Sequence, residues 1–420
     1  MYKEKVMEIV NEKFFLGRQP ILDRNQEIVG YELLFRAADI NYAEFDSYAH
    51  AVTSVISSAL ASFGMREVLG EKFGFINVHL GLLLSEMLEL LPINQTVIEL
   101  LETIQLDGLV VERCRELRKR GFQIALDDHV FNPSDTDVYS VVDIIKIDIL
   151  NTGMDALPDI VSQLRKFPVK ILAEKVETVE QFEICYALSF DLFQGYFFER
   201  PVVLNRKKID VSGLAMLKLL QQLTIDVDIG QLEKSFKENP ALSYNLLRLV
   251  NSVAMGMQEK IKTLRHAIIL LGVKQLRRWI QLSLFTGQDS RGVNHPLLEM
   301  AAVRGRLMET MVRQLGAPAV SEEQVEAAFL VGILSLLDVL FETSMEEIVA
   351  NLNLDDITSS ALLKREGELG RILTLTEKLE VTDFDAVAIL LVDCGITLDQ
   401  LLTAQLEAFN WRSSVIHKEE

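Results

Sequence analysis

The distribution of apolar positions divides the chain into two parts with different periodicity. Up to residue 203, short apolar and β-branched runs of strand length alternate with stretches of helical pattern. Alternation of buried strands with helices is typical of a parallel sheet that is covered on both sides, and six or more such units favour a closed barrel. The clearest strand-like runs are FGFINVHL (73–80), TVIELLE (96–102), FQIALDD (122–128), DIIKIDI (143–149), VKILAEKV (169–176) and FDLFQGYFF (190–198).

The second part has the pattern of helices only. Apolar residues recur there at helical spacing, and Asn239-Pro240 and Gly272 interrupt the pattern. We therefore predict a TIM-like (β/α) barrel over residues 1–203, an α/β domain, followed by an all-α domain over residues 204–420. The helical runs lie at residues 212–223, 228–238, 241–254, 263–272, 274–285 and 322–341.

Composition narrows the classes of function. Apolar residues make up 49% of the chain and charged residues 25%, as in globular proteins, and the formal net charge is −19. This charge argues against non-specific binding to nucleic acid or to an anionic membrane surface. Cys114, Cys185 and Cys394 are far apart, which disfavours a disulfide framework or a cysteine zinc site. With no signal-peptide core and no uncharged apolar run of membrane-spanning length, we expect a cytoplasmic protein.

Specific polar residues stand at the carboxyl ends of the predicted strands. In a (β/α) barrel these ends share one face, which is where active sites lie. Carboxylates with an amide and a lysine suit Mg²⁺ or Mn²⁺, and two such ions can promote attack on a phosphodiester. Taken singly, each residue is also compatible with a helix cap or a solvated turn. The set is Glu32, Asn77, Glu99, Glu102, Asp127, Asp128, Lys146, Asp148, Glu174, Glu177 and Gln194.

The order and spacing of these residues resemble one family. RQPILDRNQEIVGYELLFR (18–36) is similar to the opening of the EAL domain, the cyclic di-GMP phosphodiesterase family, with ELL in place of the naming triplet. The later blocks INVHL, IELLE, ALDD, IKID, AEKVET and FQGYFFERP follow in the family's order. The resemblance covers about residues 14–203.

The resemblance implies roles for individual residues. Metal ligands correspond to Glu32, Asn77, Glu99 and Asp127, with Asp128 at the second metal. Lys146 and Glu174 correspond to the pair that positions and deprotonates water, and Glu177 and Gln194 to further positions of the metal site or water network. Arg36 corresponds to a phosphate-contacting arginine, and Gln19 and Asp148 to residues that line the ligand cleft. Two Mg²⁺ or Mn²⁺ ions are implied, with Ca²⁺ expected to inhibit.

The loop after Asp127-Asp128 departs from the family. The family has a glycine-bearing DDFG-type loop, whereas this chain has DDHVFN with no glycine, so the loop cannot follow its usual path. Glu102 matches the glutamate that braces this loop, but the usual partner is missing. His129 could supply a nitrogen ligand or be a solvated loop residue, and Lys175 replaces a glycine beside Glu174.

The helical part resembles the HDOD domain. The resemblance rests on NPALSYNLLRLVNS (239–252), with Asn239 in place of an aspartate, and on AIILLG followed by LR. The chain has no His-Asp dipeptide, so this part lacks the ligands of a metal-dependent HD hydrolase. We predict a non-enzymatic module that contacts protein partners.

The order of the two domains resembles the YuxH-type EAL–HDOD signalling proteins of bacteria. We therefore predict a cytoplasmic regulator that binds cyclic di-GMP, keeps the ligand set and hydrolyses the dinucleotide to linear pGpG at a low or conditional rate. The alternatives are an inactive cyclic di-GMP receptor and a protein–protein scaffold. A homodimer is possible in this family, and no direct contact with nucleic acid or membrane is expected.

Overall fold

The computed structural model describes residues 14–37, 68–195, 211–224, 228–250, 261, 263–284, 296–315, 320–341, 343–352 and 354–416. The chain forms two compact units. The first is Met1–Val202 together with Leu375–Asn410, and the second is Val203–Thr374 together with Trp411–Glu420. The boundary between the EAL-type domain and the HDOD domain after residue 203 remains a prediction. The structure differs from it in one respect, because Leu375–Asn410 pack with the barrel.

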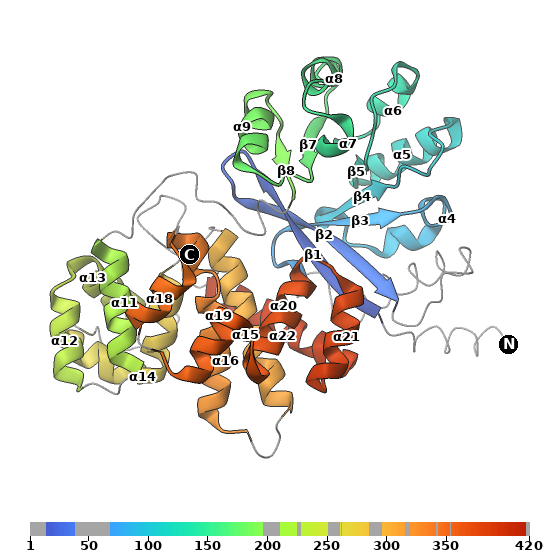
Figure 1. The fold of residues 1–420 in the computed structure, drawn as a ribbon. Coiled ribbons are helices and arrows are strands. Elements are labelled where there is room, and N and C mark those ends of the chain that lie inside the picture. The colour runs from blue at the N-terminus through green and yellow to red at the C-terminus, as the bar shows by residue number, and fades with distance from the viewer. Residues whose placement is uncertain are drawn as a thin grey trace. The chain divides into compact units, whose positions relative to one another are not determined.

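The first unit contains a closed barrel of eight strands in sequential order (Figure 1). β1 is antiparallel to both of its neighbours, β2 and β8, while the pairs from β2–β3 to β7–β8 are parallel. The strands are β1 (Phe14–Asp23), β2 (Ile28–Ala37), β3 (Phe73–Val78), β4 (Thr96–Leu100), β5 (Gln123–Leu126), β6 (Ile144–Asp148), β7 (Lys170–Glu174) and β8 (Leu192–Phe193). The predicted TIM-like barrel is confirmed, with one reversed strand that the apolar pattern did not indicate.

α-Helices and 3-10 helices connect the strands from β3 to β8. Asp107 caps the first turn of α5, and Gly121 ends that helix with φ of 105°. Thr178 and Gln181 form a capping box that begins α9. The elements are α4 (Leu80–Leu83), η1 (Glu86–Leu90), η2 (Ile93–Gln95), α5 (Gly108–Arg120), η3 (Pro133–Asp135), α6 (Thr136–Tyr139), α7 (Ile149–Thr152), α8 (Leu157–Leu164) and α9 (Val179–Ala187).

An apolar layer fills the barrel interior. It takes one buried residue from most strands: Ile21, Phe75, Val97, Ala125, Ile144, Leu172 and Leu192. In β3 to β8 a polar residue of the predicted site stands two positions after the layer residue, near or just after the carboxyl end of the strand. The apolar layer therefore forms the floor beneath that site.

Three C-terminal helices contribute to the first unit: the end of α20 (Gly367–Glu380), α21 (Phe384–Cys394) and most of α22 (Leu398–Ile416). They pack against the paired strands β1 and β2. Phe384 stacks on Phe15 with ring centroids 5.6 Å apart. A Cβ at Gly17 would lie 2.7 Å from the Thr382 side chain, so this approach requires glycine.

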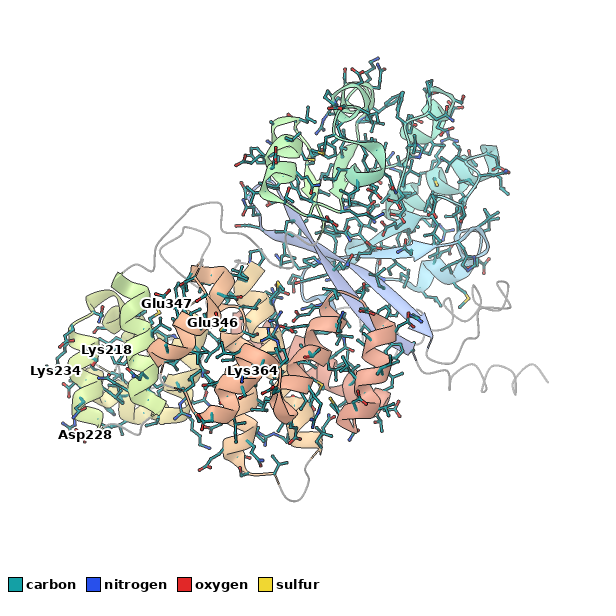
Figure 2. All side chains as sticks on the ribbon, viewed as in Figure 1. Lys218, Asp228, Lys234, Glu346, Glu347 and Lys364 are labelled. Carbon is teal, nitrogen blue, oxygen red and sulfur yellow. The ribbon has the colours of Figure 1, made fainter. Side chains whose placement is uncertain are left out.

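The second unit is helical, as predicted. Gly272, with φ of 75°, breaks α14 at the position where the sequence pattern is interrupted. Figure 2 draws the side chains, and the labelled charged ones lie at the exposed surface of this unit: Lys218, Asp228, Lys234, Glu346, Glu347 and Lys364. The helices are α11 (Val211–Thr224), α12 (Ile229–Lys237), α13 (Pro240–Val250), α14 (Leu264–Ser283), α15 (Pro296–Leu315), α16 (Glu322–Leu334), α17 (Leu337–Phe341), α18 (Met345–Leu352) and α19 (Asp356–Lys364).

One helical segment of this unit is apolar over a long stretch. Among the described residues, Glu322–Phe341 is long and apolar enough to cross a membrane by length and composition. However, 61% of its most apolar window is buried inside the protein. The core helix of a soluble protein has the same properties, so the segment is weak evidence for a membrane span.

Candidate functional site

A single buried lysine organises the carboxylates at the strand ends. Lys146 lies near the end of β6 and is fully buried. Its Nζ lies 2.7 Å from Glu174 Oε1, 2.9 Å from Asp127 Oδ1 and 3.3 Å from Glu32 Oε2, and it also pairs with Glu99. Four carboxylates, one from the middle of β2 and three from the ends of β4, β5 and β7, therefore surround one ammonium group, which leaves a local excess of negative charge.

Amide side chains fix the first of these carboxylates. Asn77 Nδ2 donates to Glu32 Oε1 over 2.8 Å, and Gln194 Nε2 donates to Glu32 Oε2 over 2.7 Å. Gln194 also donates to Gln19 Oε1 over 3.2 Å. A Cβ at Gly195 would lie 2.3 Å from the backbone nitrogen of Val176, so the glycine after Gln194 lets β8 approach the end of β7.

Burial and mutual repulsion shift the ionisation of the cluster. Burial, reinforced by the neighbouring carboxylates, raises the pKa of Glu99 well above its ordinary value despite Lys146. Burial likewise raises the pKa of Glu174 to about 8. Burial alone would lower the pKa of Lys146, but the four carboxylates raise it well above its ordinary value, so the lysine is charged. Glu32 is the exception, because Lys146 and the two amides outweigh its burial and lower its pKa.

The donor atoms fit hard divalent cations. The residues that the structure describes form two groups of carboxylates able to hold an ion, Glu32–Glu99–Glu174 and Asp127–Asp128–Glu174. Buried oxygens of this region also have no hydrogen-bond partner within the described part of the chain: Asn77 Oδ1, Glu99 Oε2, Asp128 Oδ1 and Glu174 Oε2. Such atoms are costly unless a cation or water meets them, and carboxylate and amide oxygens are the ligands of Mg²⁺ and Mn²⁺. Glu174 belongs to both groups, whereas the sequence indicated only a role in proton transfer.

The loop after Asp128 is built around a buried tyrosine, Tyr139. The hydroxyl of Tyr139 lies 2.8 Å from His129 Nε2, accepts from the Asn132 backbone N–H over 2.8 Å and donates to the Asn132 carbonyl over 3.0 Å. Phe131 stacks on the same ring with centroids 5.7 Å apart. His129 is thus largely buried and turned toward Tyr139, so neither expectation for it, a metal ligand or a solvated residue, describes its contacts.

Replacing Tyr139 with phenylalanine tests this role of the loop. We expect a loss of about 1–3 kcal/mol in the free energy of unfolding, because the change leaves the Asn132 N–H and the His129 ring without their buried partner. We also expect weaker Mn²⁺ binding, because Asp128 begins the same loop. Urea unfolding and a Mn²⁺ titration measure the two effects. Tyr186→Phe, a change at a half-exposed tyrosine, is the matched control; an equal response of the two variants would contradict the assignment.

A second lysine approaches the cluster from the side. Lys175 adopts φ of 57°, a left-handed conformation at the position where the EAL pattern has glycine. Its Nζ lies 2.5 Å from Asp148 Oδ2 and 3.6 Å from Asp128 Oδ2. Asp148 is also occupied by capping α7, since it accepts from the backbone N–H groups of Leu150 and Asn151. Lys175 thus neutralises part of the charge beside the second carboxylate group.

Three predicted residues lie apart from the cluster. Glu102 is in an exposed turn and Glu177 is exposed before α9, and neither side chain has a hydrogen bond or ion pair within the described part of the chain. The structure therefore offers no contact for the predicted bracing role of Glu102. Arg36 lies farther along β2 and pairs with Asp385 of α21. That pairing has no signal in the sequence.

The barrel, with its carboxylate cluster at the strand ends, defines the class of protein. The EAL domain family matches residues 79–201, and the HDOD domain family matches residues 214–381. The chain belongs to the EAL–HDOD family of bacterial proteins, as the sequence predicted: it is 30% identical to the uncharacterized protein YuxH of Bacillus subtilis over 409 residues, 95% of this chain and 98% of that protein.

A second full-length relative carries an activity in its name. The cyclic di-GMP phosphodiesterase CdgJ of Vibrio cholerae is 31% identical over 409 residues, 96% of this chain and 93% of that protein. Among solved structures, an EAL domain protein from Listeria monocytogenes is 21% identical, with a TM-score of 0.37, over 47% of this chain and 92% of that chain.

Proposed function

We propose that this protein is a cyclic di-GMP phosphodiesterase that turns over slowly, forming linear pGpG. The observation that carries the proposal is the pair of carboxylate groups that meet at Glu174 around the buried Lys146. Full-length similarity to a named cyclic di-GMP phosphodiesterase supports the choice of substrate. The retained amides of Asn77 and Gln194 support a site kept for ligands, since a pure scaffold has no need of them.

The residues divide the chemistry among them. Glu32, Asn77, Glu99, Asp127, Asp128 and Glu174 would hold Mg²⁺ or Mn²⁺, which when bound lowers the pKa of water and offsets phosphate charge. Lys146 holds the carboxylates in register and faces the reacting region as a fixed positive charge. Glu174, whose Oε2 has no hydrogen-bond partner among the described residues, is the carboxylate placed to accept a proton from water. Arg36 would contact a phosphate of the ligand with its guanidinium group.

Two local features support a low rate. The ammonium of Lys175 lies beside Asp128, where it competes with a second cation for the same carboxylate. Hydrogen bonds of Tyr139 hold the loop that carries Asp128, and this loop lacks the glycines of the EAL pattern, which supports an altered geometry of the second carboxylate group. Loss of one well-placed catalytic group reduces rates by about 10²–10³.

The helical unit has a separate part in the proposal. Both carboxylate groups found among the described residues lie in the barrel, and none involves α11–α19. We assign to the HDOD unit the contact with protein partners, in the cytoplasm. Homodimerisation, which the resemblance allows, would be a property of the barrel.

Calorimetric titration with cyclic di-GMP in the presence of Ca²⁺ tests the ligand. We expect saturable heat at a ratio of one dinucleotide per site, since Ca²⁺ should permit binding without turnover. Substitution of Arg36 with alanine should weaken this binding by about tenfold or more, as charge-assisted hydrogen bonds are worth about 1.5–3 kcal/mol. Absence of heat for the wild-type protein, together with absence of product in Mg²⁺ or Mn²⁺, would leave only a scaffold role.

A further inference from the structure

Paired strands β1 and β2 carry the site residues and the contact with α21 on the same face. Residues directly opposite in an antiparallel pair project to the same side, and the register pairs Gln19 with Glu32 and Phe15 with Arg36. Positions 32 and 36 also share a face because side chains alternate along a strand. Arg36 therefore lies about 13 Å beyond Glu32 toward the open end, given a rise of roughly 3.3 Å per residue.

The start of α21 rests on this face. Phe384 stacks on Phe15, and the close approach of Thr382 to Gly17 brings the chain down onto β1. The next residue, Asp385, pairs with the guanidinium of Arg36. Asp385, from the C-terminal part of the chain, therefore pairs with the guanidinium group of Arg36. In the proposed function this group contacts a phosphate of the ligand.

Buried contacts hold this helix pair in place. Gln405 of α22 is buried and donates to the Leu16 carbonyl over 2.9 Å. The guanidinium of Arg18, on the other face of the strand, lies between the rings of Tyr31 and Phe409, 4.3 Å and 3.8 Å from their centroids. Burial of these rings stabilises the docking far more than one exposed ion pair can.

The Arg36–Asp385 ion pair is the exposed part of the contact between these helices and the strands β1 and β2. The Asp385 side chain is 76% exposed and that of Arg36 is 31% exposed. Exposed ion pairs contribute little stability and exchange readily. An anionic ligand can therefore displace Asp385 without undocking α21 and α22.

We propose that Asp385 is a specificity-determining residue of the ligand site, an internal anion that competes with a phosphate group of cyclic di-GMP for Arg36. The inference rests on the proposed function, because it assumes that Arg36 contacts the ligand. It makes apparent affinity depend on α21, which lies beyond the matched HDOD region. A ligand must offer Arg36 a better partner than this carboxylate, which disfavours weakly charged molecules.

Cyclic di-GMP titration of full-length variants in Ca²⁺ is the test. Asp385→Ala should lower the dissociation constant about two- to fivefold, the range that an exposed ion pair allows. The gain should shrink as salt is added, because exposed charges are screened. Asp393→Ala removes the same charge from an exposed position on the same helix and should leave affinity unchanged. Asp385→Asn, which preserves the size of the side chain, should give a smaller gain in affinity. This variant replaces Asp385→Ala in the test if the alanine variant folds poorly.

The outcomes separate the two proposals. If the wild-type protein binds and both Asp385 variants bind equally well, the competition is refuted while the proposed function stands. If the Asp385 variants bind and the wild-type protein does not, the competition for Arg36 is supported, while the proposed activity of the wild-type protein is refuted. If no form of the protein binds cyclic di-GMP, the proposed function fails and the inference fails with it. An equal gain in affinity from Asp393→Ala would mean that the gain comes from the change in net charge, which would also refute the competition.

Discussion

Replacement of Lys146 with methionine is expected to lower the free energy of unfolding of the metal-free protein by about 3–5 kcal/mol. Methionine preserves the apolar stem but removes the charge that Glu32, Glu99, Asp127 and Glu174 share. Carboxylates left together in a buried site repel one another and lose a hydrogen-bond donor. Chelator-treated protein should be unfolded in urea at fixed pH, with the free energy extrapolated to water.

Lys170→Met provides the matched control. Lys170 is exposed at the start of the neighbouring strand β7, so its replacement should change the unfolding free energy by less than about 0.5 kcal/mol. A loss below about 1 kcal/mol in Lys146→Met would contradict the view that this lysine holds the carboxylates together. Mn²⁺ should restore part of the lost stability, because cations replace the missing charge.

Glu99→Gln is expected to separate stability from activity. Glu99 is fully buried, its Oε2 has no hydrogen-bond partner among the residues that the structure describes, and burial raises its pKa. A neutral amide of the same shape should leave the metal-free protein as stable, or more stable by about 1–2 kcal/mol, as is common where functional sites are strained. Formation of pGpG should fall by about 10²–10³, since one carboxylate of the cation site is gone.

The stabilisation of the protein by Mn²⁺ measures the effect of Glu99→Gln on cation binding without any measurement of turnover. Mn²⁺ should raise the unfolding temperature of the wild-type protein, because a ligand that binds only the folded state stabilises it. The rise should be much smaller in Glu99→Gln. Glu183→Gln, at an exposed glutamate of α9 outside the cluster, should keep the wild-type response. A full Mn²⁺ response in Glu99→Gln would place the ion elsewhere.

The sequence predicted those features that depend on local pattern. Strand ends follow directly from apolar runs, so the meeting of Glu32, Glu99, Asp127, Lys146 and Glu174 could be predicted once a barrel was assumed. The break at Gly272 is also local. The reversal of β1 could not be predicted in this way, because an apolar run does not specify the direction of its partner.

Side-chain contacts without a periodic pattern could not be predicted from the sequence. The order of the loop after Asp128 comes from the Tyr139 hydroxyl, which reaches back to Asn132 and His129 through side-chain hydrogen bonds without periodicity. The Arg36–Asp385 pair joins positions 349 residues apart. The resemblance also suggested roles for Glu102 and Glu177 that have no matching contact in the described part of the chain.

Formation of linear pGpG by the purified wild-type protein tests the central proposal most directly. Cyclic di-GMP should be incubated with Mg²⁺ or Mn²⁺, and the products separated by chromatography, alongside Glu32→Ala and a Ca²⁺ control. We expect slow formation of pGpG that requires Mg²⁺ or Mn²⁺, stops with Ca²⁺ and is lost in Glu32→Ala. No product from the wild-type protein, or equal product from Glu32→Ala, would contradict a catalytic role for the carboxylate cluster.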